Sequence, residues 1–158
     1  MRNAPEAFER MYRGEYARLA RGLASYGDGA EEAVQEAFVK ALVRWRHVGS
    51  LDDPAGWVRR VAVNQLLNRR RSQAREQAAT ARLGRTTADD PDIQLLDVAD
   101  AVRGLSPQQR ITVGLRYGGG YPIDDVATAM DLSVGAVKYH LHTARERLRA
   151  TLSEHRDA

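Results

Sequence analysis

The segment 54–72, PAGWVRRVAVNQLLNRRRS, decides how the rest of the chain has to be arranged. Its apolar residues recur at helical spacing and form one stripe, which predicts a helix lying on a core. The stripe consists of Trp57, Val58, Val61, Ala62 and Leu66. The polar face of the same helix consists of Arg60, Asn64, Asn68 and Arg71. Because Asn competes with the helical backbone for hydrogen bonds, an ordinary solvated helix would favour Glu and Lys there, so this face calls for a functional explanation.

The length and composition exclude several classes of protein. With 158 residues the chain can form one ordinary domain or two small ones, each close to the lower limit for a self-sufficient core. The sequence has no cysteine, which excludes disulfides, thiolate metal sites and cysteine nucleophiles. The N-terminus has no basic segment followed by an apolar run, and no stretch approaches the roughly 20 apolar residues that span a bilayer. We therefore expect a cytoplasmic protein with no membrane insertion.

Basic charge is concentrated in the first part of the chain. The net charge is only +3, and all basic residues except Lys40 and Lys138 are arginines. Residues 1–72 hold 13 basic and 9 acidic groups, whereas residues 96–158 hold 8 of each, and the excess peaks at residues 69–71. The planar fork of arginine suits phosphates and base edges, although a GC-rich genome produces the same bias with no functional meaning.

Two helices are predicted before residue 54. The first is an amphipathic helix near the N-terminus, with an apolar stripe at helical spacing. Asp28, with Glu31 three residues later, has the spacing of a capping box and is expected to start the second helix. The apolar stripe of that second helix consists of Ala33, Val34, Ala37, Phe38, Ala41, Leu42 and Trp45. Residues 47–53 lack a helical period and are predicted as a loop, after which Asp53 caps the next helix.

The periodic pattern stops after Ser72 and returns at Val98. Scattered Arg, Ala, Gln and Thr followed by an acidic run cannot bury much surface, so residues 73–95 are predicted to be a flexible linker, helical at most at its start. The chain is therefore expected to form two small helical domains, residues 1–72 and 96–158.

The second domain has the pattern of a helix-turn-helix. Ser106, followed by Pro107 and Gln109, predicts a capped helix start. A short helix over residues 122–130, a turn, and a long final helix capped by Ser133 give the arrangement in which the second helix enters the major groove. The inner stripe of the final helix is expected to consist of Val134, Val137, Leu141, Ala144, Leu148 and Leu152. The outward residues that are candidates for touching DNA are Lys138, Tyr139 and His142.

Two sets of motifs resemble the extracytoplasmic-function sigma factors of bacterial RNA polymerase. Residues 28–42, DGAEEAVQEAFVKAL, and residues 57–64, WVRRVAVN, with the arginine run that follows them, resemble region two of that family. Residues 105–110, LSPQQR, residues 125–127, DVA, and residues 133–138, SVGAVK, resemble region four. The likeness covers nearly the whole chain outside the linker. It implies an all-α protein with a region-two helical bundle and a region-four helix-turn-helix joined by a flexible linker.

In that family, region two holds the polymerase and opens the promoter at the minus-ten element, while region four reads the minus-thirty-five element. The resemblance implies that the polar face of the helix at residues 54–72 meets the unpaired non-template strand. Asn64 and Asn68 would hydrogen-bond base edges or sugars, because an amide offers both a donor and an acceptor. The residues that would meet phosphates are Arg60, Arg69, Arg70 and Arg71. The loop at residues 47–56 would help to shape the pocket for an extruded base.

The resemblance also implies partner contacts. The residues that would meet the Arg-rich coiled coil of the largest polymerase subunit are Glu32, Gln35, Glu36 and Lys40, and carboxylates suit such a partner. Region four would bind the polymerase flap and duplex DNA, the DNA contacts being Arg116, Ser133, Ala136, Lys138, Tyr139, His142 and Thr143. An anti-sigma protein is a further partner that the family admits. No cofactor, metal or catalytic residue is implied.

Four positions depart from the family pattern. Thr or Ser is usual at Ala136, a small polar residue at Tyr139, Arg at Thr143 and Asp at Asn68. These changes imply a different promoter preference, or a weaker reliance on the minus-thirty-five element, rather than a different fold.

Simpler interpretations of the same residues remain open. Trp45 and Trp57 are expected to be core anchors rather than platforms for stacked bases, because both lie on apolar stripes. His140 and His142 point in different directions on a helix and do not suggest a metal site. Nothing forms an acid–base constellation, so no enzymatic activity is expected. The alternatives to a sigma factor are a stand-alone helix-turn-helix repressor or activator, and an anti-sigma or other protein-binding bundle.

Overall fold

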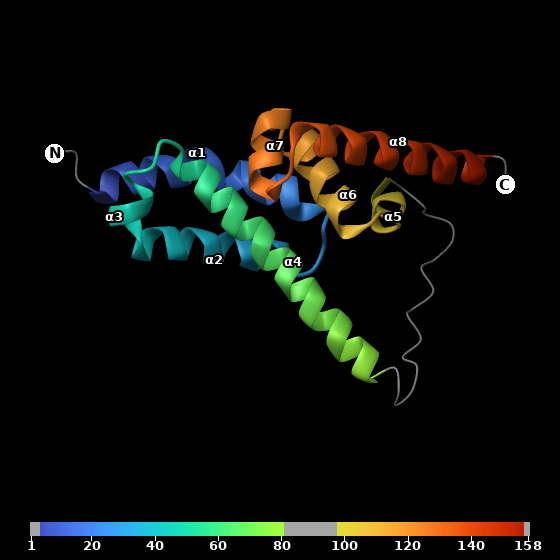
Figure 1. The fold of residues 1–158 in the computed structure, drawn as a ribbon, viewed down its shortest axis with the longest axis horizontal. Helices are drawn as coiled ribbons and strands as arrows, with labels where there is room; N and C mark the ends of the chain where they lie inside the picture. Colours follow the sequence, from blue (N-terminus) through green and yellow to red (C-terminus); the bar gives the residue numbers. More distant parts are fainter. Residues whose placement is uncertain (1–3, 81–97, 157–158) are drawn as a thin grey trace.

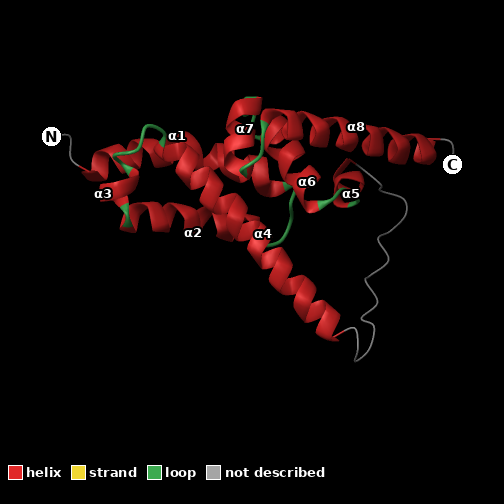
Figure 2. Ribbon diagram, viewed as in Figure 1, coloured by secondary structure: helices red, strands yellow, loops and turns green. Residues whose placement is uncertain are grey.

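The chain folds into helices throughout the residues that the structure describes (Figures 1 and 2). The structure is a computed structural model that describes residues 4–80 and 98–156, apart from a few side chains. Its elements are α1 (Ala4–Ala24), α2 (Ala30–Val43), α3 (Trp45–Val48), α4 (Pro54–Thr80), α5 (Val98–Arg103), α6 (Pro107–Val113), the π-helical turn η2 (Gly114–Gly118), α7 (Ile123–Met130) and α8 (Val134–Arg156). Neither described range contains a strand, which confirms the prediction of an all-α fold.

The N-terminal half is a bundle in which α1, α2 and α4 pack around apolar residues. From the predicted stripe of α4, Val58, Ala62 and Leu66 are buried. The ring of Trp45 packs edge to face on a phenylalanine of α1, with ring centroids 5.4 Å apart, and so holds α3 against the bundle. Trp57 also lies partly buried against the core, so both tryptophans are core anchors as expected.

The start of α2 differs from the prediction. Its N-cap is Gly29 rather than Asp28, and no side chain caps it. Gly27 and Gly29 have φ angles of 100° and 87°, in the left-handed region that favours glycine. Because glycine geometry sets the tight turn between α1 and α2, the capping box expected from Asp28 and Glu31 does not form, and both side chains are exposed.

Two predicted boundaries also shift. The predicted loop at residues 47–53 begins inside α3, which continues to Val48. α4 begins where predicted, and the amide of Gly56 donates to the Asp53 carboxylate at 3.0 Å. It then continues past Ser72 to its end in the predicted linker. Residues 81–95 of that linker lie outside the described residues.

The C-terminal half confirms the predicted helix-turn-helix. Ser106 and Gln109 form a complete capping box at the start of α6. At the start of α8, the backbone amide of Ala136 donates to the Ser133 hydroxyl at 3.1 Å. Asp131 ends α7 in the left-handed conformation, with φ of 55°, which turns the chain into α8.

The inner stripe of α8 is shorter than predicted. Val137, Leu141 and Ala144 are buried, and Leu148 is partly buried. Val134 and Leu152 are more than a third exposed, because each lies towards an end of α8, away from the stretch that packs on α6 and α7.

The two halves share one apolar core. α1 packs on η2, and α4 packs on α7 (Figure 1 shows α4 and α7). One buried cluster includes Leu19 and Leu66 from the first half and Leu115 and Val126 from the second. α1 and η2 approach each other closely because glycines lie at their contact: a Cβ atom on Gly114 would overlap the backbone of α1. The idea of two domains separated by a flexible linker did not anticipate this contact.

Gly114→Ala is expected to destabilise the protein by about 1 to 3 kcal/mol, because the added methyl group overlaps the carbonyl of Gly22. Urea unfolding followed by circular dichroism measures the change. The matched control is Gly14→Ala in α1, where a Cβ atom meets nothing within 4 Å. That control should stabilise the protein by about 0.5 to 1 kcal/mol, because alanine is the better helix former. Equal stability of the two variants would contradict the close crossing.

Candidate nucleic-acid and partner interfaces

The polar face of α4 lies at the surface and not in the core. Asn64, Asn68 and Arg71 are exposed. Arg60 is half exposed, and its guanidinium pairs with the carboxylate of Asp131, at the end of α7, at 3.2 Å. We call Arg60, Asn64, Asn68 and Arg71 the amide ridge. The ridge presents amide and guanidinium groups side by side, which is the combination that could read and hold a nucleic-acid strand.

Arg69 points away from the amide ridge and toward α2. Its guanidinium lies 2.7 Å from the Glu36 carboxylate and 3.3 Å from the Glu32 carboxylate. It also donates to the backbone carbonyl of Gly29 at 3.2 Å. The Arg69 guanidinium, which is expected to meet DNA phosphates, is therefore already paired with carboxylates. The side chain of Arg70 lies outside the described residues.

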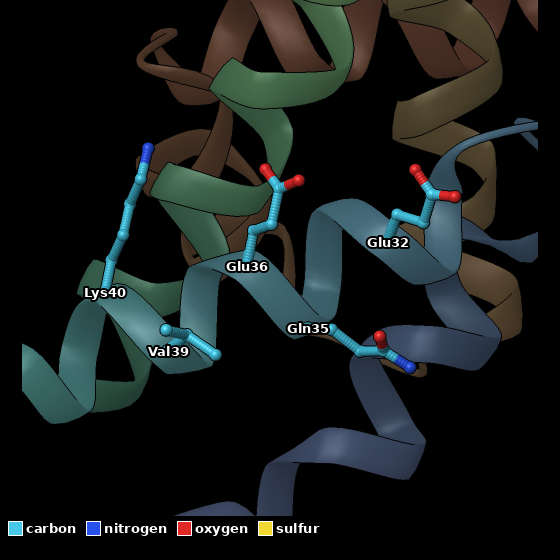
Figure 3. A pocket seen from close by; sticks show the side chains of 5 residues that line it. All are labelled: Glu32, Gln35, Glu36, Val39 and Lys40. Atoms are coloured by element: carbon cyan, nitrogen blue, oxygen red, sulfur yellow. The ribbon is translucent and has the colours of Figure 1, made fainter.

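All four residues of α2 that are expected to contact a polymerase line a shallow groove along this helix (Figure 3). Its lining is formed by Glu32, Gln35, Glu36, Val39 and Lys40. Glu32, Glu36 and Lys40 are directed toward α4, whereas Gln35 points toward α1 and donates to the Tyr16 hydroxyl at 3.3 Å. The structure thus gathers the four predicted residues on one exposed surface but directs them to two different neighbours.

An apolar patch beside this groove was missed by the sequence analysis. Val39, Leu42 and Val43 are 59%, 53% and 80% exposed. Leu42 had been expected to lie in the buried stripe, but the core of the bundle closes at Ala41, and the last turn of α2 extends past it. An exposed cluster of aliphatic side chains next to carboxylates is typical of a protein-binding surface. The sequence did contain an indication, since Val39 and Val43 lie off the helical stripe.

The outward face of α8 carries the predicted duplex-binding residues. Lys138, Tyr139 and His142 are exposed, Tyr139 at 67%. Thr143 is partly buried, and its hydroxyl donates to the backbone carbonyl of Tyr139 at 2.8 Å. Ala136 is partly buried next to the capping hydroxyl of Ser133. The exposed side chains lie where the second helix of a helix-turn-helix meets base edges.

Arg116 is less available than the residues of α8. It lies in the middle of η2, is partly buried, and donates to the backbone carbonyl of Tyr121 at 3.2 Å. Its expected phosphate contact would compete with this hydrogen bond.

Comparisons with known proteins match both halves. The family model "Sigma-70 region 2" matches residues 9–76, and "Sigma-70, region 4" matches residues 95–148. The RNA polymerase sigma-E factor of Streptomyces avermitilis is 33% identical over 143 residues, covering 89% of this chain and 79% of the relative. The ECF RNA polymerase sigma factor SigL of Mycobacterium tuberculosis is 32% identical over 136 residues, covering 79% of this chain and 75% of the relative.

The chain belongs to the extracytoplasmic-function sigma factors. It is an alternative sigma factor, which directs RNA polymerase to promoters in transcription initiation. The family is one of initiation factors and not of enzymes.

Solved structures have the same fold across both halves of this sigma factor. The sigma factor RpoE of Bartonella quintana, solved in complex with the anti-sigma factor NepR, aligns with a TM-score of 0.66 at 24% identity, over 94% of this chain and 96% of that one. CnrH, solved in complex with the cytosolic domain of CnrY, aligns with a TM-score of 0.65 at 24% identity, over 96% and 95%. In the part of the chain that the structure describes, no helix is both long and apolar enough to cross a membrane.

A buried polar network ties the two halves of the sigma factor together. The Glu15 carboxylate of α1 accepts a hydrogen bond from Arg59 of α4 at 2.9 Å and from the Tyr121 hydroxyl at 2.5 Å. Arg18 donates to the backbone carbonyls of Gly119 and Gly120, and its guanidinium lies 4.1 Å from the centre of the Tyr121 ring. One side chain of the C-terminal half is thus enclosed by three charged side chains of the N-terminal half.

The environment fixes the protonation of this network. Burial raises the pKa of the Tyr121 phenol, and the hydrogen bond to Glu15 raises it further, so Tyr121 remains a proton donor. Burial by itself would lower the pKa of Arg59, but the hydrogen bond and charge of Glu15, together with the charges of Asp53 and Asp125, outweigh it, and the net shift is upward. Sequence reasoning missed the interaction of Glu15, Arg59 and Tyr121, because these residues come from segments that are far apart in the chain.

Tyr121→Phe is expected to lower the free energy of unfolding by about 1 to 3 kcal/mol, because the Glu15 carboxylate loses a charge-assisted hydrogen bond. Urea denaturation is the measurement. Tyr117→Phe is the matched control, since Tyr117 is exposed and its hydroxyl accepts a hydrogen bond from the exposed Arg145 at 2.9 Å. The control should change stability by less than about 0.5 kcal/mol. If both variants behave alike, the Tyr121 hydroxyl does not support the contact between the halves.

Proposed function

We propose that the amide ridge of α4 holds the unpaired promoter strand at the minus-ten element and that the outward face of α8 reads the minus-thirty-five duplex. The observation that carries this assignment is the exposure of Asn64 and Asn68 beside Arg60 and Arg71, on a helix whose other face is buried. An amide can donate to and accept from a base edge, and the guanidinium groups can hold the backbone on either side. We further propose that the protein works in the cytoplasm and has no enzymatic activity of its own.

The polymerase is proposed to dock on α2. The groove at Glu32 and Glu36 offers carboxylates to a cationic partner, and the patch formed by Val39, Leu42 and Val43 offers apolar surface beside it. A protein interface commonly combines an apolar centre with a charged rim, in which the charges steer the partner and fix the register. The Arg-rich coiled coil of the largest polymerase subunit has the complementary chemistry, and the polymerase flap would take the C-terminal half.

The described arrangement is proposed to be a closed form of the protein. The minus-ten and minus-thirty-five elements are about 25 base pairs apart, which corresponds to roughly 85 Å of duplex. In this structure α4 and α7 are in contact, and Arg60 of the amide ridge pairs with Asp131 of the helix-turn-helix. The two DNA-binding faces therefore have to separate before they can engage both elements.

A negative regulator is a further proposed partner. RpoE of Bartonella quintana was solved with the anti-sigma factor NepR, and its fold extends over 94% of this chain. We propose that a protein of the same kind binds this sigma factor and keeps it from the polymerase.

Asn64→Ala is expected to reduce open-complex formation by roughly tenfold or more while leaving closed-complex binding nearly unchanged, because the amide acts only on unpaired bases. Permanganate footprinting of the melted region in the reconstituted holoenzyme measures the first effect, and a gel shift measures the second. Gln77→Ala removes an exposed amide farther along α4 and is the matched control. Normal melting by the Asn64 variant would contradict the role of the ridge. Tight promoter binding without polymerase would instead favour a stand-alone regulator.

Opening of the closed form can be followed by energy transfer between dyes. The natural chain has no cysteine, so Ala24→Cys and Ala150→Cys, both at exposed positions, provide one labelling site in each half. Transfer is expected to fall when core polymerase and promoter DNA are added, because the halves move to separate elements. The control is the same labelled protein with promoter DNA alone, for which transfer should stay near its starting value. Unchanged transfer in an active holoenzyme would rule out opening.

A further inference from the structure

Arg69 is held by the same carboxylates that the proposed polymerase contact requires. One guanidinium nitrogen lies 2.7 Å from Glu36, and the other lies 3.3 Å from Glu32 and 3.2 Å from the Gly29 carbonyl. The fork of an arginine fits a carboxylate and a phosphate in the same way. In the free protein, Glu32 and Glu36 are therefore paired with a guanidinium that could equally bind a phosphate of the DNA backbone.

Gln65 extends this arrangement into a continuous row between α2 and α4. With its amide oriented to satisfy both neighbours, Gln65 donates to Glu36 at 3.0 Å and accepts from Lys40 at 2.8 Å. We call Lys40, Gln65, Glu36, Arg69 and Glu32 the α2–α4 seam. Figure 3 shows that Glu32, Glu36 and Lys40 all extend from α2 on the side of α4. The seam connects the proposed polymerase surface with the helix that carries the amide ridge.

The ion pairs between Arg69 and the two glutamates of the seam are solvent-exposed and therefore easily exchanged. The side chains of Glu32 and Glu36 are 75% and 52% exposed, and that of Arg69 is 32% exposed. Exposed pairs contribute little to stability, so a competing cation can replace one partner at small cost. The pair between Arg59 and Glu15 is different, because both side chains are at most 10% exposed and breaking it would leave a buried charge.

We propose that polymerase docking transfers Arg69 from Glu32 and Glu36 to the promoter backbone. This inference rests on the proposed docking of a cationic polymerase surface on α2. When that surface neutralises the two carboxylates, Arg69 loses its intramolecular partners. Arg69 follows Asn68 directly in the sequence, so once its guanidinium leaves α2 we expect its long side chain to turn toward the amide ridge and contact a phosphate of the strand held there. Arg69 thereby couples the two surfaces.

The exchange has two opposite consequences for one substitution. In the free protein Arg69 competes with the polymerase for Glu32 and Glu36, so removing it should favour polymerase binding. In the holoenzyme Arg69 contacts DNA, so removing it should weaken promoter binding. An arginine that merely clips α2 to α4, or one that only binds DNA, would not produce both effects.

The test measures the affinity of the full chain for purified core RNA polymerase by fluorescence anisotropy. Arg69→Ala should strengthen binding about two- to fivefold, the range expected for release of exposed ion pairs. In the Glu32→Gln/Glu36→Gln background the same substitution should give no gain, because the carboxylates no longer compete. Arg75→Ala removes an exposed arginine farther along α4, outside the seam, and should leave the affinity unchanged. Thermal unfolding of each variant shows whether the bundle is intact.

The second measurement is promoter binding by the holoenzyme as a function of salt. Arg69→Ala should lower the slope of log affinity against log salt by roughly 0.7, the contribution of one phosphate contact on a single strand. If Arg69→Ala binds polymerase more weakly and has lower thermal stability, Arg69 only stabilises the packing of α2 on α4, and the exchange is overturned. If the Glu32→Gln/Glu36→Gln variant weakens polymerase binding but Arg69→Ala has no effect, the exchange alone is wrong. If the Gln variants leave polymerase affinity unchanged, the docking surface itself is wrong and the exchange falls with it.

Discussion

The buried carboxylate of Glu15 is the constraint on which the arrangement of the two halves depends. A carboxylate taken out of water has to be paired and hydrogen-bonded, and Glu15 obtains its partners from both halves, with Arg59 on one side and Tyr121 on the other. The two partners are not equivalent. Arg59 belongs to the same bundle and stays with Glu15 if the halves separate, so the charge remains compensated. Tyr121 supplies one strong hydrogen bond that exists only in the closed form. If the protein opens as proposed, the network favours the closed form and leaves the N-terminal bundle intact.

Carboxylates restrain the proposed DNA-binding arginines of α4 in two independent places. Arg60 is paired with Asp131 across the contact between the halves, and Arg69 is paired with Glu32 and Glu36 on the proposed polymerase surface. Each pair is partly exposed and weak, so neither blocks function by strength. Their effect would come from the events that break them. The proposed opening would separate Arg60 from Asp131, and polymerase docking would compete with Arg69 for Glu32 and Glu36. The positive charges of Arg60 and Arg69 would then become fully available only when the protein is both open and bound, which would discourage unproductive binding to DNA by the free protein.

The sequence predicted the local features of this protein well, because those features depend on neighbouring residues. The caps at Ser106 and Ser133, the buried stripe of α4 and the exposure of Asn64 all follow from spacing and side-chain chemistry. The resemblance to sigma factors supplied the functional assignment. What the sequence did not provide depends on contacts between distant segments: the partner of Arg69, the network around Glu15, and the shared core. The exposure of Leu42 was missed for the same reason, since a helical stripe does not show where its covering helix ends.

The proposed closure changes the spacing of the two proposed DNA-binding faces more than their accessibility. Asn64 and Asn68 on α4, and Lys138 and Tyr139 on α8, are exposed in the closed form. Each face could therefore touch DNA alone, but the contact between α4 and α7 prevents the two from reaching sites roughly 85 Å apart. A closed protein could therefore bind only one promoter element at a time. It would lose the gain in affinity that comes from binding two linked sites on the same DNA molecule. A protein held closed by a few side chains can be switched by any partner that separates its halves, because no buried recognition surface has to be uncovered first.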